Sequence, residues 1–122
     1  MRCPCLSGLP YAECCEPLHR GESVAPTAEQ LMRSRYSAFA VGDADYLLAT
    51  WHPSTRPATL TLEPELRWYR LDILGRSAGG PLDTHGEVEF EAFWRGPDYR
   101  GTQRERSRFV REGGRWFYVA SV

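Results

Sequence analysis

The chain has no lysine, so all fifteen of its basic residues are arginine. They are set against sixteen acidic residues, which leaves a formal net charge of -1. Proteins that gather nucleic acid through a general positive field carry a basic excess, and this chain has none. The composition therefore argues against direct nucleic-acid binding and leaves only local clusters of arginine for such contacts.

The chain also lacks long apolar runs. No stretch approaches the 18 apolar residues that indicate a membrane-spanning helix, and the N-terminus has no apolar core of a signal peptide. We therefore expect no membrane contact and a cytoplasmic location, where thiols stay reduced.

Cysteine is absent beyond residue 15, and all four cysteines lie within the first fifteen residues. A length of 122 residues suits one compact domain with a small appendage. We expect the thiol-rich unit to cover residues 1–20, a linker 21–26, and an α+β domain 27–122. A unit of twenty residues cannot be held by a hydrophobic core and needs a staple.

The cysteines stand as C-x-C-x(8)-C-C, formed by Cys3, Cys5, Cys14 and Cys15. Thiolate sulfur is a soft anionic donor that suits Zn(II) in a tetrahedral shell. Gly8 and Pro10 lie between the two pairs and allow the loop to fold back. The pattern therefore predicts a zinc ion as cofactor, held by all four thiolates.

Other interpretations of the cysteines stay open at this point. His19 follows Cys15 by one helical turn and is an alternative fourth ligand in its place. Free buried thiols, a redox-sensing or catalytic thiol, and two disulfides formed by cross-pairing are the remaining alternatives. A closed four-thiolate shell leaves no open position for a substrate, which disfavours the catalytic alternative.

Two helices are expected after the linker. The first follows an N-cap at Thr27, with Gln30 completing a capping box, and ends at Gly42. The second follows a cap at Asp43 and runs through Trp51. The pattern then changes to apolar–polar alternation, which predicts strands at residues 58–62, 66–76, 85–95, 102–112 and 115–121. Residues 77–81 are expected to form a loop.

The register of one hairpin is predicted from its two faces. Placing Phe93 opposite Arg104 also places Glu91 opposite Arg106, so that one face becomes a ladder of acidic and basic residues. The other face is mostly apolar, and Glu105 interrupts it. Glu105 is therefore expected to turn inward.

Residues 3–15, CPCLSGLPYAECC, resemble the SEC-C motif, best known from the C-terminal tail of the bacterial preprotein translocase ATPase. There the motif binds zinc and contacts a chaperone and the ribosome. The rest of the chain resembles the bacterial YchJ-type proteins, through segments 26–29, 31–39, 46–53, 86–90, 107–109 and 114–119.

This resemblance implies a zinc knuckle followed by a cone-like domain of helices packed on a curved antiparallel sheet, similar to nuclear transport factor 2. The family has no established activity, so no catalytic residue is carried over. Such proteins often carry a SEC-C unit at both ends, whereas this sequence ends at Val122, so no function that needs two knuckles is expected.

Cone-like domains often enclose a cavity, which serves enzymes and pure binding proteins alike. Arg35 interrupts the apolar stripe of the first helix and needs an anion, for which Glu105 is the candidate. His52 is expected to cap a helix end, with general-base catalysis as its alternative role. The cavity candidates are Arg35, Tyr36, Trp51, His52, Trp68 and Glu105.

The leading hypothesis is a zinc-binding interaction protein without catalysis, whose protein partner belongs to the translation or secretion machinery. Nucleic acid would be reached only through the ribosome, and a homodimer is expected from family analogy alone. The rival is an isomerase, dehydratase or hydrolase that uses Glu105 or His52 as base, and a ligand-binding module without chemistry is the third hypothesis. Convergence of Glu105 and His52 in one cavity would favour the enzyme.

Overall fold

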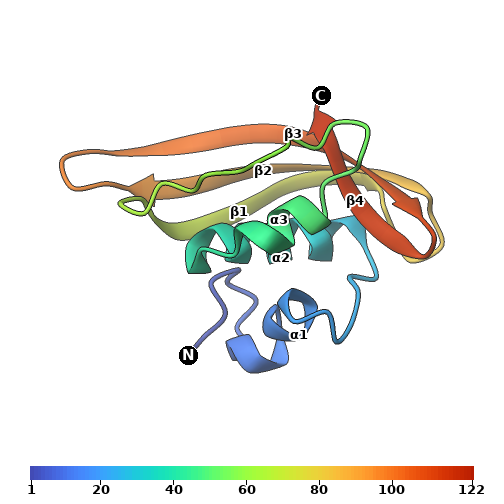
Figure 1. Cartoon of the computed structure of the whole chain (residues 1–122), viewed down its shortest axis with the longest axis horizontal. Coiled ribbons are helices and arrows are strands. Elements are labelled where there is room, and N and C mark those ends of the chain that lie inside the picture. Colours follow the sequence, from blue (N-terminus) through green and yellow to red (C-terminus); the bar gives the residue numbers. More distant parts are fainter.

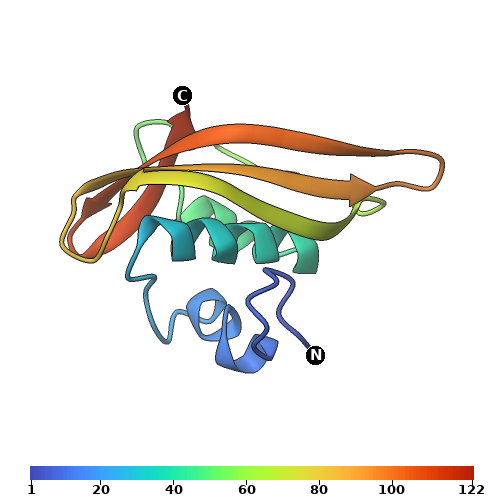
Figure 2. The ribbon, with the colours of Figure 1, turned by 180° about the vertical axis from the view of Figure 1, so that it is seen from behind.

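The computed structural model describes all 122 residues, which form three layers (Figure 1). A curved four-stranded sheet lies on one side, two helices pack beneath it, and the cysteine-rich N-terminal segment lies below the helices (Figure 2). The N-terminal segment contains a short 3₁₀ helix, η1 (Tyr11–Glu13), and a single helical turn, α1 (Glu16–His19). The α+β fold expected from the sequence is confirmed.

Helix α2 (Ala28–Val41) has the boundaries that its capping residues predict. The Thr27 hydroxyl accepts a hydrogen bond from the Gln30 backbone N–H at 3.1 Å, and Gly42 ends the helix with a left-handed φ of 81°. The first turn is also tied to the sheet, because the Ala28 backbone N–H donates to the carbonyl of Gly79. The position of α2 under the sheet is therefore set at its start.

Helix α3 (Ala44–Ala49) is shorter than predicted. Asp43 caps it as expected, but the helix ends at Thr50, and Trp51 lies outside it. Thr50 and His52 instead exchange backbone hydrogen bonds with Tyr118 of the sheet. This pairing across the sheet edge competes with the last helical turn and prevails over it.

The sheet is an antiparallel meander in the order β1 (Arg67–Ala78), β2 (His85–Arg95), β3 (Arg100–Glu112) and β4 (Arg115–Ser121). Register irregularities interrupt β1 twice and the β3–β4 pairing once. Such bulges bend strands, and they accompany the curvature seen in Figure 1. The strand predicted at 58–62 is wrong, since these residues form no ladder, and β1 extends into the predicted 77–81 loop.

The predicted β2–β3 register is wrong by two residues. Phe93 pairs with Thr102, and Glu91 pairs with Arg104. The cause is the turn: β2 and β3 are joined by four residues, 96–99, because β3 begins at Arg100 and not at residue 102. A shift of two residues preserves the side-chain faces, so the acid–base ladder survives, with Arg106 within 2.5 Å of Glu87.

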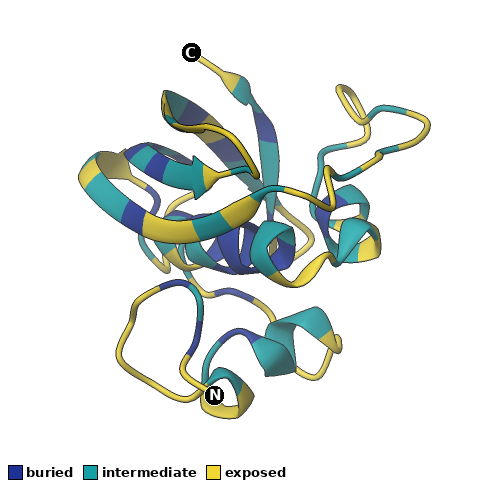
Figure 3. Ribbon diagram, turned by 90° about the vertical axis from the view of Figure 1, so that its left-hand side faces the viewer, coloured by how far each residue is buried: buried dark blue, intermediate teal, exposed yellow.

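The core lies between α2 and the concave face of the sheet. Helix α2 contributes Ala28, Leu31, Met32 and Tyr36, and the strands contribute Leu71, Val88, Phe90, Ala92, Phe109 and Trp116. Figure 3 shows the buried residues concentrated along α2 and the facing strands. The buried cysteines form a second, separate cluster below α2. No helix is long and apolar enough to cross a membrane.

Arg35 is buried in this interior but does not form the predicted ion pair with Glu105. Its Nη1 donates to the Leu47 carbonyl at 2.8 Å and to Thr50 Oγ1 at 2.7 Å. Its guanidinium carbon lies 4.7 Å from the ring centroid of Tyr118, whose hydroxyl in turn donates to Glu105 at 3.3 Å. Tyr118 therefore links the two charged residues without direct contact between them.

This arrangement predicts weak coupling between Arg35 and Glu105. In a double-mutant cycle with Arg35→Met and Glu105→Gln, the coupling free energy measured by denaturant unfolding is expected to stay below about 1 kcal/mol. A direct buried pair would instead lose about 3–5 kcal/mol when one partner is removed. A coupling of that size would show that the two side chains meet in solution.

Candidate metal centre and cone cavity

The N-terminal segment folds back on itself around the cysteines. Arg2 and Pro10 form an isolated antiparallel bridge, and the Cys3 backbone N–H donates to the Leu9 carbonyl at 2.9 Å. Leu6 adopts a left-handed φ of 65° and Gly8 one of 92°, which turns the chain between the two strands of this loop. The predicted return of the loop through Gly8 and Pro10 is thus observed.

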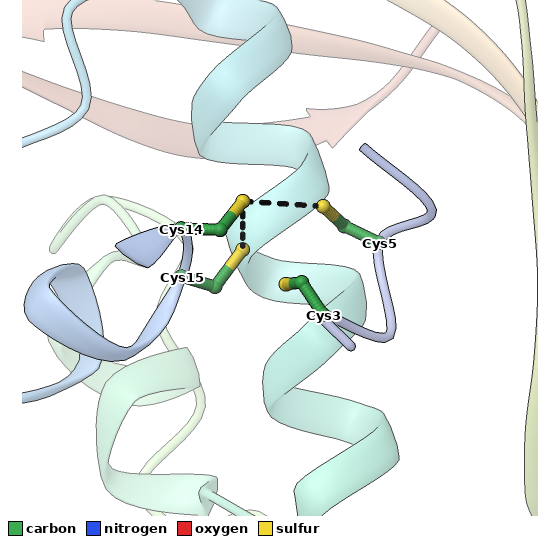
Figure 4. A group of neighbouring side chains, drawn as sticks. All are labelled: Cys3, Cys5, Cys14 and Cys15. Carbon is green, nitrogen blue, oxygen red and sulfur yellow. Dashed lines mark hydrogen bonds between the residues drawn. The ribbon is translucent and has the colours of Figure 1, made fainter. Parts of the chain in front are cut away.

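The four sulfur atoms converge at one point (Figure 4). All lie within 4.8 Å of one another, with 3.6 Å between Cys5 Sγ and Cys14 Sγ and 3.9 Å between Cys14 Sγ and Cys15 Sγ. A tetrahedral zinc ion with bonds of about 2.3 Å places its sulfur ligands about 3.8 Å apart. The arrangement therefore fits a metal ion bound by four thiolates.

The same distances decide against disulfides. A disulfide requires its sulfur atoms about 2 Å apart, and all four cysteines are free thiols. Three of them, Cys3, Cys5 and Cys15, are buried, and Cys14 is half-buried at the rim. Their chemistry is that of a soft, largely dehydrated ligand set.

Hydrogen bonding and burial shift the pKa values of the clustered thiols in opposite directions. A hydrogen bond from the Cys15 thiol lowers the pKa of Cys5, whereas that same bond, together with burial, raises the pKa of Cys15. Burial also raises the pKa of Cys14. One thiolate forms readily and opposes ionisation of its neighbours, so only a bound cation would allow all four to ionise.

His19 does not join the cluster. Its Nδ1 lies 2.5 Å from the Tyr11 hydroxyl, and its Nε2 lies 2.8 Å from the Ser34 carbonyl oxygen of α2. Both ring nitrogens are thus engaged, which leaves no free donor for a metal ion. The structure places His19 as a tie between the N-terminal segment and α2 and does not support it as a substitute for Cys15.

Helix α2 supplies further contacts that the sequence did not single out. The Ser37 hydroxyl lies 3.3 Å from Cys15 Sγ and 3.5 Å from Cys3 Sγ, and Arg33 donates to the Cys5 carbonyl at 2.9 Å. Hydroxyl and N–H donors of this kind orient metal ligands. In the sequence, the signal for Arg33 and Ser37 was their spacing of one helical turn, on the side of α2 opposite its apolar stripe.

The second candidate site is a cavity of about 170 Å³ between α2 and the sheet. Five of the six predicted cavity residues line it: Arg35, Tyr36, Trp51, Trp68 and Glu105. His52 does not, because its ring packs against Phe117 and its Nε2 lies 3.0 Å from Glu112. Glu105 and His52 therefore do not converge, which removes the arrangement expected for the enzyme hypothesis.

Sequence reasoning missed Tyr118 as a cavity residue. It stacks against Arg35 and meets the Trp51 ring edge-on, with centroids 5.2 Å apart. Burial raises the pKa of Tyr118 to about 12, so its hydroxyl stays protonated as a donor. The alternation of β4 pointed it toward the apolar face, but its role depends on the pairing of β4 with residues 50–52.

Two family profiles match this chain. One, described as the SEC-C motif, covers residues 2–17, and the other, described as the YchJ middle NTF2-like domain, covers residues 27–121. A UPF0225 protein of Corynebacterium efficiens is 55% identical over 97% of this chain and 90% of its own length. A UPF0225 protein of Deinococcus radiodurans is 52% identical over 96% of this chain and 85% of its own length.

Two solved structures share the fold. The solution structure of a SEC-C motif containing protein from Rhodopseudomonas palustris matches with a TM-score of 0.84 and 34% identity, over 100% of this chain and 98% of that one. A crystal structure of a SEC-C motif containing protein from Psychrobacter arcticus gives 0.78 and 29%, over 96% and 79%. With an N-terminal SEC-C motif and an NTF2-like domain over the remainder, the chain belongs to the YchJ-type family of bacterial UPF0225 proteins.

Proposed function

We propose that this protein is a zinc-binding interaction protein without catalysis, whose N-terminal knuckle contacts a protein partner of the translation or secretion machinery. The observation that carries the proposal is the closed set of four sulfur atoms within 4.8 Å of one another. Four thiolates complete the tetrahedral shell of zinc and leave no position for a substrate. The metal would then act on shape and stability.

The knuckle offers an apolar contact surface at its tip. Leu6 and Leu9 are 55% and 50% exposed, although their loop is held on both sides by the cysteine cluster. A rigid loop with exposed leucines loses little conformational entropy on binding and buries apolar area against a partner. The resemblance to the SEC-C motif suggests a partner in translation or secretion.

We infer a cytoplasmic location from the same thiol chemistry. Four close thiols keep their metal-binding form only where they stay reduced, and bacterial cytoplasm meets that condition. On the outer sheet face, Arg104 is paired with Glu89 and Arg106 with Glu87, which reduces the free positive charge there for nucleic acid. Contact with a ribosome would then run through protein.

Elemental analysis tests the metal. The purified chain is expected to carry about one zinc per molecule, and Cys14→Ser is expected to lose most of it, because three thiolates hold zinc less tightly than four. His19→Ala is the control and should keep its zinc, since His19 points to Tyr11 and Ser34. Full zinc in Cys14→Ser, or loss in His19→Ala together with retention in Cys15→Ser, would overturn the ligand assignment.

Chelation tests whether the cone depends on the knuckle. Removal of zinc is expected to unfold residues 1–20 and to leave amide-exchange protection in β2 and β3 intact. The cysteine cluster is separate from the main core, and α2 turns the small polar residue Ser37 toward it. The remaining domain should melt about 4–8 °C lower, which corresponds to ~1 kcal/mol.

A single collapse of both parts upon chelation would contradict this expectation. It would mean that the bonds from the knuckle to α2, such as Arg33 to the Cys5 carbonyl, are needed for the cone to fold.

Partner binding is tested with matched surface variants. Leu6→Ser combined with Leu9→Ser is expected to keep zinc and to lose co-sedimentation with ribosomes or co-purification with secretion components. Leu82→Ser is the control, because Leu82 is 93% exposed at a hairpin loop of the cone. Equal recovery of the same partner with all variants would rule out the knuckle tip as the contact.

A further inference from the structure

The cone cavity carries a second inference, independent of the knuckle. Its walls are aromatic and include Tyr36, Phe39, Trp68 and Phe90. The cavity reaches the surface beside Gln103, which is exposed and also lines it. A volume of about 170 Å³ is below that of drug-sized sites, so any occupant is a small molecule.

Two residues that line this cavity each have a buried polar atom without a hydrogen-bond partner. These atoms are the indole nitrogen of Trp51 and the hydroxyl of Tyr36, and they are the only buried side-chain nitrogen or oxygen atoms of the chain in this condition. The backbone of Arg70 lies near the Tyr36 hydroxyl but does not meet hydrogen-bond geometry with it. Burial raises the pKa of Tyr36 to about 12, so its hydroxyl remains protonated. Both atoms therefore offer unused donors.

Arg35 adds a positive charge with free donors. The residue is 4% exposed, and only its Nη1 donates within the protein, to Leu47 and Thr50. Nε and Nη2 make no hydrogen bond within the protein, and Arg35 lines the cavity. Burial lowers the pKa of Arg35 only to about 10, which leaves it charged at neutral pH.

Two aromatic rings lie beside the Arg35 guanidinium. Trp51 and Tyr118 lie with their ring centroids 5.2 and 4.7 Å from its central carbon. Both rings contact the guanidinium, and a carboxylate binds a guanidinium in its plane, through paired N–H donors. The Nε and Nη2 edge is the part of Arg35 that remains for such a partner.

Glu105 is the acidic side chain among the residues that line the cavity, and both of its carboxylate oxygens already accept hydrogen bonds. Its Oε2 accepts from Ser107 at 2.5 Å and from Tyr118 at 3.3 Å, and its Oε1 accepts from Gln103 at 3.3 Å. The fully buried unpaired groups of the cavity residues are donors, which favours an anionic acceptor over a cation.

We propose that the cone binds a small organic carboxylate with an apolar or aromatic body. Its carboxylate meets the Nε and Nη2 edge of Arg35 and the Trp51 indole N–H, and its body lies against Tyr36, Phe39 and Trp68.

Benzoate is the probe, because it combines a carboxylate with an aromatic body. Titration into the ¹⁵N-labelled, zinc-loaded full chain is expected to shift the Trp51 indole N–H resonance saturably, with a Kd on the order of 1 mM. That resonance is assigned by its loss in Trp51→Phe. Benzyl alcohol, which is uncharged, and benzylamine, which is a cation, should leave it in place.

The variants remove one donor at a time. Trp51→Phe keeps an aromatic ring and removes the indole N–H, so its benzoate binding is followed by the shifts of backbone amide resonances. Its affinity is expected to fall about tenfold, as for loss of a hydrogen bond to a charged group. Tyr36→Phe removes only the free hydroxyl, and it should fold at least as stably as the natural chain. Trp94→Phe and Tyr69→Phe are the matched controls outside the cavity and should bind benzoate normally.

Three results would overturn the proposal. One is the absence of any saturable shift with benzoate in the folded protein. Another is equal binding of benzoate by Trp51→Phe and by the natural chain, with both folded by the same melting measurement. The third is preferential binding of benzylamine, which would assign the cavity to a cation at Glu105. None of these results depends on zinc or on a partner of the knuckle.

Discussion

Helix α2 is packed on two opposite sides, and the arrangement of the whole chain depends on this. Its apolar side lies against the concave face of the sheet, where Tyr36 and Met32 join the main core. Its other side carries Ser34 and Ser37, both fully buried. A buried hydroxyl needs a hydrogen-bond partner, and here the partners are the Leu31 carbonyl and the Tyr46 hydroxyl for Ser34 and the Cys15 sulfur for Ser37. The helix thus joins an apolar interface to a polar one.

The two interfaces have different physical origins. The interface with the sheet is apolar and is stabilised by burial, which needs many residues and a large area. The knuckle is too small to form a hydrophobic core of its own, so its folded shape would depend on a metal ion bound by the four thiolates. Arg33 and His19 then orient the knuckle on the helix through backbone carbonyls, at Cys5 and Ser34 respectively.

The cavity also lies against α2, on the side of the helix that carries Arg35. Arg35 lies on α2 beside the core. Its Nη1 donates to the Leu47 carbonyl and to Thr50 Oγ1, at the C-terminal end of α3. The chain after α3 then pairs with β4 through Tyr118, which brings Trp51 and Tyr118 to the guanidinium. A buried charge is thereby stabilised by carbonyl and hydroxyl oxygens and by aromatic rings, without a carboxylate in direct contact. This arrangement leaves unpaired N–H donors beside a cavity whose walls are mostly apolar.

Local chemistry in the sequence was sufficient for much of this structure. The caps at Thr27 and Asp43 and the glycine at residue 42 act within a few residues, and they set the starts of both helices and the end of α2. The density of cysteine in fifteen residues was enough to favour a metal centre, and the convergence of the four sulfur atoms fits it. Strand alternation also identified which face of β3 turns inward, including Glu105.

Tertiary structure alone decided the contacts that join distant segments. Alternation has a period of two, so it could not distinguish the observed β2–β3 register from one displaced by two residues, and the four-residue turn made that choice. The end of α3 depended on backbone bonds to Tyr118, sixty-eight residues beyond Thr50, which helix propensity cannot anticipate. The same holds for His19 and Arg35: their side chains have several chemically suitable partners in the sequence, and only the packing of α2 against both layers determines which of them lie within reach.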